Sequence, residues 1–231
     1  MRIVLPTITT TWDSDWREKI KEINCLRLEE AAIFPTCLEK KEREEMYRLL
    51  EESTLKRIPL VHLRGDMAPE EISYLKEKFQ TEIFNIHSPK INFFSKKLES
   101  LKKEFYLENT RIPWDEEEVK EFAGLCLDIS HLENDKRLHP EIFENDMKIL
   151  KKYPIGCNHI SAVKKKMFFS NNEWQYDCHK LESFSELDYL KNYDISLFAS
   201  YIAIELENPI EEQLRAKEYI LEILKEKERS K

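Results

Sequence analysis

Histidine and carboxylate side chains recur in this sequence where short apolar runs end. Five of the six histidines lie at or just after the end of such a run: His62, His87, His131, His159 and His179. Carboxylates occupy similar places: Glu108, Asp128, Asp177, Glu205 and Glu207. Imidazole and carboxylate together suit Zn²⁺, Mn²⁺ and similar divalent ions. The pattern predicts a metal site assembled from several separate segments.

Each of these residues also has an ordinary structural interpretation. A single histidine at a strand end is usually hydrogen-bonded to its surroundings, and an aspartate there often caps the next helix. His139 precedes a proline and a helix, so we interpret it as structural. Because possible metal ligands occur at so many of the predicted strand ends, we favour one site that they share. Side chains two residues apart on a strand point the same way, so Cys126 should point inward with Asp128, and Cys157 with His159. The same rule cannot choose between Glu205 and Glu207.

The elements that must position these residues alternate along the chain. Eight short apolar runs are predicted strands: Arg2–Pro6, Cys25–Glu29, Ile58–Leu63, Glu82–His87, Glu104–Glu108, Ala123–Asp128, Ile155–His159 and Ser200–Glu205. Between them lie segments with helical periodicity, among them Leu38–Glu52, Pro69–Phe79, Pro140–Lys152 and Pro209–Glu228. Each unit takes about 29 residues, the size of one βα repeat. The pattern predicts an α/β fold, a single compact (β/α)8 TIM barrel over residues 1–231. An open doubly wound sheet is the weaker alternative, because no glycine-rich turn follows the first strand.

Composition narrows the classes of function. Only three glycines occur, which excludes a glycine-rich phosphate loop. The net charge of −8 disfavours nucleic acid as a partner without excluding it. Five cysteines without CxxC spacing indicate a reducing compartment, and we expect a cytoplasmic protein. We find no signal peptide and no transmembrane segment, so we expect no membrane partner.

The order of the motifs resembles that of the xylose isomerase-like barrels. The similar segments are Leu-Glu-Asn-Thr at 107–110, Leu-Asp-x-x-His at 127–131, His159, Asp177-x-His179 and the closing glutamate. The resemblance covers essentially the whole chain and involves two branches, the sugar isomerases with the keto-sugar epimerases, and the endonuclease IV-type apurinic-site nucleases. The epimerase branch implies one manganese-type ion, with His131 binding substrate. Its ligands would be Glu108, Asp128, His159 and Glu205, with Glu207 as the alternative. The nuclease branch implies three zinc ions and adds His62, His87, His131, Asp177 and His179 as ligands.

The two branches imply different reactions. In an isomerase or epimerase, Glu108 and Glu205 would remove and return a proton beside a metal-chelated carbonyl. In a nuclease, clustered ions would activate water against a phosphodiester. The full ligand set favours the second reaction, whereas the acidic chain and its short loops favour a small substrate. We therefore expect a metal-dependent isomerase or epimerase of a small sugar or sugar phosphate. A metal-dependent phosphoesterase of the endonuclease IV type, DNA repair included, is the alternative, and a barrel that binds without turnover is a third.

Several further expectations accompany this choice. The cofactor should be Mn²⁺ or Zn²⁺, with one ion favoured and up to three allowed by the ligands. The longest loop, Ser161–Leu187, carries Lys164, Lys165, Lys166 and Trp174. The predicted substrate-binding residues are His131, His62, His87, Trp114 and Lys164. Epimerases of this type often pair, so a homodimer stays open.

Overall fold

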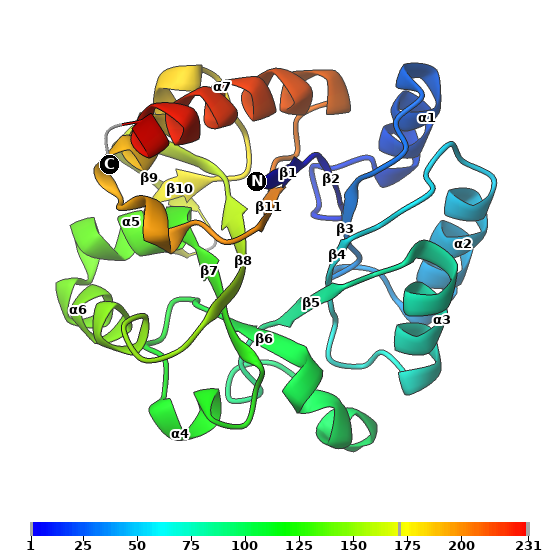
Figure 1. Ribbon diagram of the computed structural model, residues 1–231, viewed down its shortest axis with the longest axis horizontal. Helices are drawn as coiled ribbons and strands as arrows, with labels where there is room; N and C mark the ends of the chain where they lie inside the picture. The colour runs from blue at the N-terminus through cyan, green and yellow to red at the C-terminus, as the bar shows by residue number, and fades with distance from the viewer. Residues whose placement is uncertain (1, 171, 230–231) are drawn as a thin grey trace.

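The protein is a barrel of parallel strands surrounded by helices (Figure 1). The computed structural model describes residues 2–170 and 172–229. The sheet runs in the order β1-β11-β8-β7-β6-β5-β4-β3-β2, with every pair parallel. Its strands are β1 (Ile3–Leu5), β2 (Thr7–Thr9), β3 (Ala32–Phe34), β4 (Leu60–His62), β5 (Ile83–Ile86), β6 (Phe105–Glu108), β7 (Gly124–Asp128), β8 (Ile155–Ile160) and β11 (Tyr201–Ile204).

The barrel closes through its first strand, which is divided in two. β1 pairs with β11, and β2 pairs with β3. Only Pro6 separates β1 from β2. Proline has no N–H to donate, so it interrupts a strand without ending its extended course. β1 and β2 therefore fill one of eight strand positions, and the predicted (β/α)8 barrel is confirmed.

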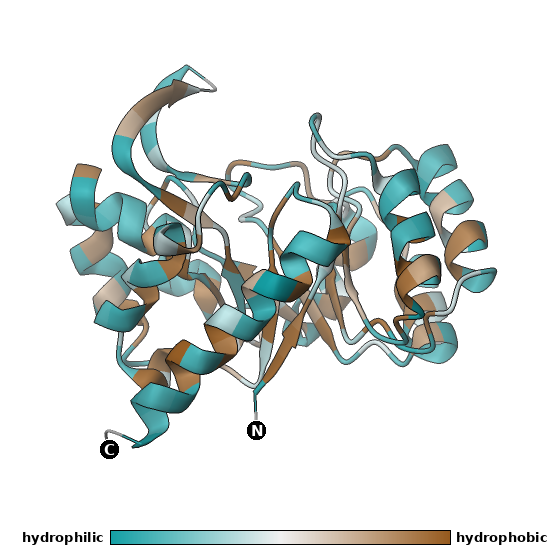
Figure 2. Ribbon diagram, turned by 90° about the horizontal axis from the view of Figure 1, so that it is seen from above, coloured by the Kyte–Doolittle hydropathy of each residue, from teal (hydrophilic) through white to brown (hydrophobic). Residues whose placement is uncertain are grey.

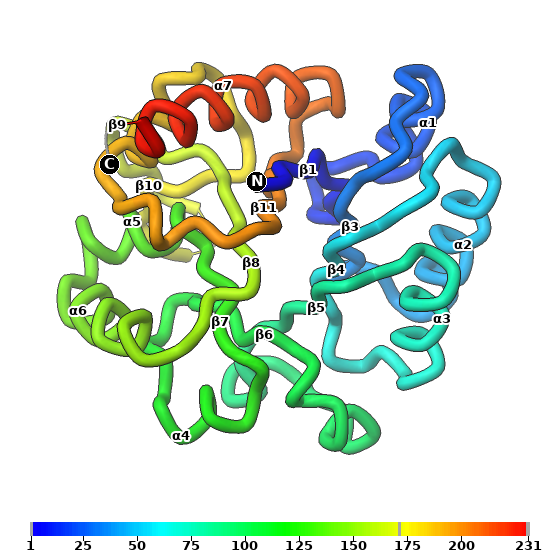
Figure 3. The backbone as a smooth tube through the Cα atoms, viewed as in Figure 1, coloured from blue at the N-terminus to red at the C-terminus, as the bar shows by residue number. Residues whose placement is uncertain are grey.

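Helices surround the sheet, as the backbone trace shows (Figure 3). The α-helices are α1 (Trp16–Leu26), α2 (Lys40–Glu51), α3 (Pro69–Phe79), α4 (Glu116–Val119), α5 (Ile129–Leu138), α6 (Pro140–Ile149) and α7 (Ile210–Arg229). Three 3₁₀ segments complete the connections: η1 (Lys96–Glu104), η2 (Phe184–Asn192) and η3 (Ile195–Leu197). In the part of the chain that the structure describes, no helix is long and apolar enough to cross a membrane.

The core has two layers. The larger cluster lies between strands and helices and contains Leu107, Leu125 and Leu127. The smaller one fills the inside of the barrel and consists of Leu5, Ala32, Phe34, Leu60, Cys126, Cys157 and Ala203. Cys126 and Cys157 thus point inward while Leu127 points outward, as the strand alternation predicts.

Two predicted elements were wrong. The predicted strand Cys25–Glu29 begins inside a helix, because Cys25 and Leu26 belong to α1. Asp15 caps that helix by accepting the Arg17 and Glu18 amides, and Arg27 ends it in the left-handed conformation, with φ of 53°. The strand that occupies this position is β3, a few residues later.

The predicted loop Ser161–Leu187 contains an antiparallel hairpin, of β9 (Ala162–Ser170) and β10 (Glu173–Cys178), followed by η2. Figure 2 shows this hairpin projecting from the barrel on the side opposite the N-terminus. The parallel strands start at the end of the barrel where the N-terminus lies. The hairpin therefore projects from the opposite end, where the strands have their C-termini.

Candidate metal centre

Four buried donors meet at the C-terminal ends of the strands. Glu108 ends β6, Asp128 ends β7, His159 lies near the end of β8, and Glu205 follows β11. One ligand atom from each lies within 4.8 Å of the others. Asp128 and His159 are register partners on adjacent strands. The regular sheet therefore fixes two of the donors side by side.

Several polar atoms of this group are buried without a hydrogen-bond partner. His159 Nδ1 lies 3.3 Å from Glu108 Oε1 and 3.3 Å from Glu205 Oε2. Neither contact has hydrogen-bond geometry, and both ring nitrogens of His159, Asp128 Oδ2 and Glu205 Oε2 lack a partner. Leaving a buried polar atom unpaired costs about 1–3 kcal/mol. A divalent ion held by these four residues would satisfy the unpaired atoms, so the donor set fits a metal.

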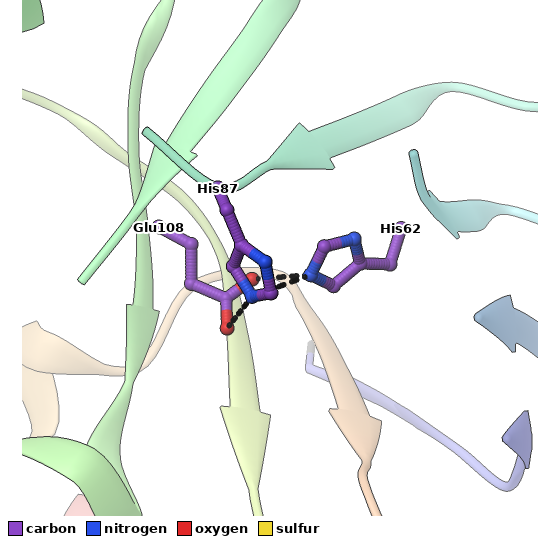
Figure 4. A group of neighbouring side chains, drawn as sticks. All are labelled: His62, His87 and Glu108. Atoms are coloured by element: carbon purple, nitrogen blue, oxygen red, sulfur yellow. Dashed lines mark hydrogen bonds and ion pairs between the residues drawn. The ribbon is translucent and has the colours of Figure 1, made fainter. Parts of the chain in front are cut away.

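A second donor group adjoins the first and shares Glu108 with it (Figure 4). His62 Nε2 lies 2.9 Å from Glu108 Oε2 and 3.2 Å from His87 Nε2. His87 Nε2 lies 3.7 Å from Glu108 Oε1. His62 Nδ1 lies 3.0 Å from the Leu63 carbonyl, which can accept only from an N–H. That contact assigns the proton of the neutral ring to Nδ1 and turns Nε2, as the ligand atom, toward Glu108 and His87.

The electrostatics of the cluster reflect crowded carboxylates. Burial opposes ionisation of Glu108, but His159, His62 and His87 outweigh it and hold the pKa of this carboxyl well below its usual range. Burial raises the pKa of Asp128, and the neighbouring Glu205 raises it further, against the effect of His131. With protein groups alone, the carboxylates share a few imidazoles as counter-charges. A divalent cation would supply the missing positive charge.

Comparison with known proteins identifies the fold. No protein-family model and no curated protein matches the sequence. Among solved structures, one described as the IolI protein with a binding zinc atom superposes with a TM-score of 0.54 at 11% identity. It covers 96% of this chain and 98% of its own. The chain shares its fold. Endonuclease IV from Thermus thermophilus also matches, at 15% identity and a TM-score of 0.44, over 96% of this chain and 100% of its own. The predicted resemblance to xylose isomerase-like barrels is confirmed at the level of the fold.

The remaining predicted ligands lie beside the barrel's two donor groups. His131 Nδ1 lies 2.6 Å from Asp177 Oδ2, and its Nε2 lies 3.8 Å from Asp128 Oδ2. His179 Nε2 lies 3.8 Å from Glu205 Oε1. Within residues 2–170 and 172–229, no group of three close donors includes His131, Asp177 or His179. The structure thus brings the three residues to the site without joining them in a third donor group.

Asp177 is instead neutralised by cationic side chains of the protein. Arg111 donates to Asp177 Oδ1 at 2.9 Å and also pairs with Glu173 on the hairpin. Burial opposes the charge of His131, but Asp128 and Asp177 outweigh it and raise the pKa of this imidazole to about 10. His131 is therefore a cation held at the edge of the metal centre.

Glu205, not Glu207, belongs to the donor set. Glu207 turns toward the segment that follows β2, where its Oε1 accepts the Thr11 hydroxyl at 2.5 Å. Strand alternation could not choose between them, because residues two apart on a strand point the same way. In the structure, the Glu205 amide still donates to the Ile160 carbonyl of β8 at 2.8 Å, whereas the Glu207 amide donates to the His179 carbonyl at 2.7 Å.

Two predicted substrate-binding residues lie away from the centre. Trp114 is 5% exposed and packs in the core between strands and helices, where its ring is covered. Lys164 forms ion pairs with Glu182 and Glu186 beside η2. Their sequence positions, after a strand end and in a long loop, did not reveal these packing partners.

Sequence reasoning missed three residues that support the ligands. Asn85 donates to Glu108 Oε2 at 2.7 Å, and Asn109 Oδ1 accepts the Asp128 amide at 2.7 Å. Asn85 sits two residues before His87 and is the register partner of His62, so strand alternation could have found it. Arg111 carried no comparable signal, because its partners lie on a hairpin that was not predicted.

Proposed function

We propose that the protein is a metal-dependent phosphoesterase that works with two divalent ions. The observation that carries the proposal is the shared carboxylate. Glu108 belongs both to the group with His62 and His87 and to the group with Asp128, His159 and Glu205. A carboxylate common to two donor groups is typical of paired-ion sites that hydrolyse phosphate esters.

The residues of the chain have distinct roles in this proposal. His62 and His87 would hold one ion, Asp128, His159 and Glu205 the other, and Glu108 both. The ions, when bound, supply activated water and positive charge to the phosphoryl group. His131, kept cationic by Asp128 and Asp177, is placed to donate a hydrogen bond to a phosphate oxygen. Asn85 orients the Glu108 carboxylate, and Asn109 holds the Asp128 backbone through its amide and carbonyl.

A pocket beside His87 supports a small substrate. It has a volume of about 320 Å³, and its lining includes Arg64, Asn92 and Phe93. That volume is near the lower end for small-molecule sites. Arg64 is already paired with Glu39 and Asp66, so the pocket offers little free positive charge to a nucleic-acid backbone. We therefore favour a small phosphate ester over duplex DNA.

An isomerase or epimerase is the second candidate, and one observation favours it. Glu108, Asp128, His159 and Glu205 form a group of four donors, and this group needs neither His62 nor His87. Glu108 and Glu205 each lie 3.3 Å from His159 Nδ1, so both carboxylates border the same ion position. Two carboxylates flanking one ion are what proton removal and return require.

The deciding experiment measures metal content and reaction together. Chelator-treated protein is titrated with Zn²⁺ and Mn²⁺, and bound metal is measured by elemental analysis. Loaded protein is then given bis(p-nitrophenyl) phosphate, an abasic-site duplex and a panel of keto-sugars in deuterated water. We expect two ions per chain and phosphodiester cleavage. One ion with deuterium incorporation at sugar carbon would replace this proposal with the epimerase, and duplex nicking would identify DNA as the substrate.

A further inference from the structure

A pair of thiols lies directly beneath the metal centre. Cys126 on β7 and Cys157 on β8 are register partners, both 0% exposed, and both belong to the cluster inside the barrel. They precede Asp128 and His159 by two residues, so they point the same way one layer deeper. Neither thiol has a role in the reaction proposed above.

Glu108 places an oxygen ligand in the same layer as these thiols. Glu108 is the register partner of Cys126 on the neighbouring strand. Glu108, Cys126 and His159 each offer a ligand atom within 4.8 Å of the other two. The three residues come from three consecutive strands, so the barrel itself fixes their spacing.

His159 has buried polar atoms that lack a hydrogen-bond partner. Its side chain is fully buried, and neither ring nitrogen has such a partner among the described residues, although Nδ1 lies 3.3 Å from carboxylate oxygens of Glu108 and Glu205. Cys126 offers its sulfur within 4.8 Å of the ligand atom of His159. The thiol and the imidazole can therefore reach the same ion.

We propose that Glu108, Cys126 and His159 form a second, deeper position for a thiophilic divalent ion such as Cd²⁺ or Zn²⁺. Binding replaces the thiol proton with an S–metal bond and releases that proton to solvent. Glu108 and His159 also belong to the upper group, so an ion in the deeper position competes with an ion held by Asp128 and Glu205.

The thiol gives this position its selectivity. Soft sulfur ligands favour Cd²⁺ and Zn²⁺, whereas Mn²⁺ prefers oxygen and nitrogen. Cys126 is fully buried, and its sulfur is the only soft donor in this group. Mn²⁺ should therefore stay in the upper position, where all donors are oxygen or nitrogen. The inference concerns ion binding and holds whichever reaction the barrel catalyses.

The test uses chelator-treated, reduced full-length protein and Cd²⁺ as the probe. Cys25, Cys37 and Cys178 are first replaced by serine, since the first two are exposed and the third is partly so. Cd²⁺ is then added to this background, to its Cys126→Ser variant and to its Cys157→Ser variant as the matched control. The ultraviolet thiolate-to-cadmium charge-transfer band is recorded, and circular dichroism checks the fold.

We expect the band in the background and in Cys157→Ser. Cys126→Ser should lose it and bind Cd²⁺ about 10-fold more weakly or worse. Mn²⁺ affinity, followed by electron paramagnetic resonance, should be unchanged in Cys126→Ser and reduced by Cd²⁺ in the background. A band that survives Cys126→Ser, or is absent from the background, would overturn the proposal. If Cys126→Ser does not fold, the ¹¹³Cd chemical shift is measured in the background and in Cys157→Ser. Sulfur ligation moves this shift far downfield, so a shift that stays upfield in these proteins would reject the site.

Discussion

Asp128 and His159 are register partners across β7 and β8, and each presents a buried polar atom that no other group in the described chain satisfies. This relationship links the fold to the site. Parallel register sets the lateral spacing of the two donors, and the barrel directs both side chains to its axis. Glu205 directly follows β11, and its amide donates to the Ile160 carbonyl at the end of β8 at 2.8 Å, so the sheet also holds this donor.

His62→Ala and Asp128→Ala should have separable effects on metal content. If Glu108 is shared by two ions, His62→Ala removes one ion per chain and leaves the ion near Asp128. Asp128→Ala removes the other, because it deletes a fully buried carboxylate of the four-donor group. Elemental analysis of each loaded variant measures this. His139→Ala is the matched control, since His139 lies at the start of α6, away from the donor groups.

Unchanged metal content in His62→Ala would show a site with a single ion. That result would leave the four-donor group intact and favour the epimerase candidate. Loss of all metal in His62→Ala would contradict both candidates, because neither gives His62 control over the Asp128 position.

Arg111→Leu should destabilise the fold by about 3 kcal/mol, the range for breaking a largely buried ion pair. The Asp177 side chain is 3% exposed and would lose its guanidinium partner. The hairpin would also lose the contact of Arg111 with Glu173. Urea denaturation measures the free energy of unfolding. Arg48→Leu is the control, because Arg48 and Glu52 form an exposed pair worth at most about 0.5 kcal/mol.

Asp177→Asn should recover part of this loss in the double variant, since the unpaired charge is removed with its partner. Equal destabilisation in the Arg111→Leu single variant and in Arg48→Leu would contradict a structural role for the Arg111 network.

Gly156→Ala should destabilise the barrel by about 1–3 kcal/mol through overpacking. A Cβ at this position would collide with the ring of Tyr106 on β6, two strands away in the sheet. Thermal unfolding followed by circular dichroism measures the effect. Combining Gly156→Ala with Tyr106→Ala makes room for the methyl group, so the double variant should lose less than the sum of the two single changes. Additive losses would exclude the contact as the cause.

The strand ends could be predicted from sequence because each combines a short apolar run with a polar terminus. Asp128 and His159 follow this rule, and alternation along the strands also predicted the inward positions of Cys126 and Cys157. Predicting the second strand failed, because Cys25 and Leu26 are exposed residues in the last turn of α1. A short apolar run alone does not distinguish a strand from the end of an amphipathic helix.

Pairing between distant segments was beyond sequence reasoning. Arg111 reaches Asp177 across 66 positions, through a hairpin whose strands read as a charged loop. Trp114 follows a strand end, as a substrate-binding residue would, yet packs in the core. Such outcomes depend on which side chains meet after the chain folds, and local periodicity holds no information on that.

Lys19 predicts a pH dependence of stability that can be separated from the metal centre. The residue is 3% exposed, and its ammonium donates to Thr9 Oγ1 at 2.7 Å and to the Leu206 carbonyl at 2.8 Å. Burial lowers its pKa to about 7, against the opposing effects of Glu207 and Glu22. In the unfolded chain the pKa is near 10.5. Between these values the unfolded chain binds more protons, so the free energy of unfolding rises as the pH increases from 7 to 10.5.

Lys19→Met should abolish this rise, which we expect to reach a few kcal/mol. Urea denaturation at a series of pH values measures it in chelator-treated protein, so metal loss does not contribute. Lys21→Met is the matched control, because Lys21 lies on the same helix, exposed and paired with Glu18. Its profile should follow that of the unmodified protein. Parallel profiles for Lys19→Met and Lys21→Met would show that Lys19 keeps its charge in the fold, stabilised by Thr9 and the Leu206 carbonyl.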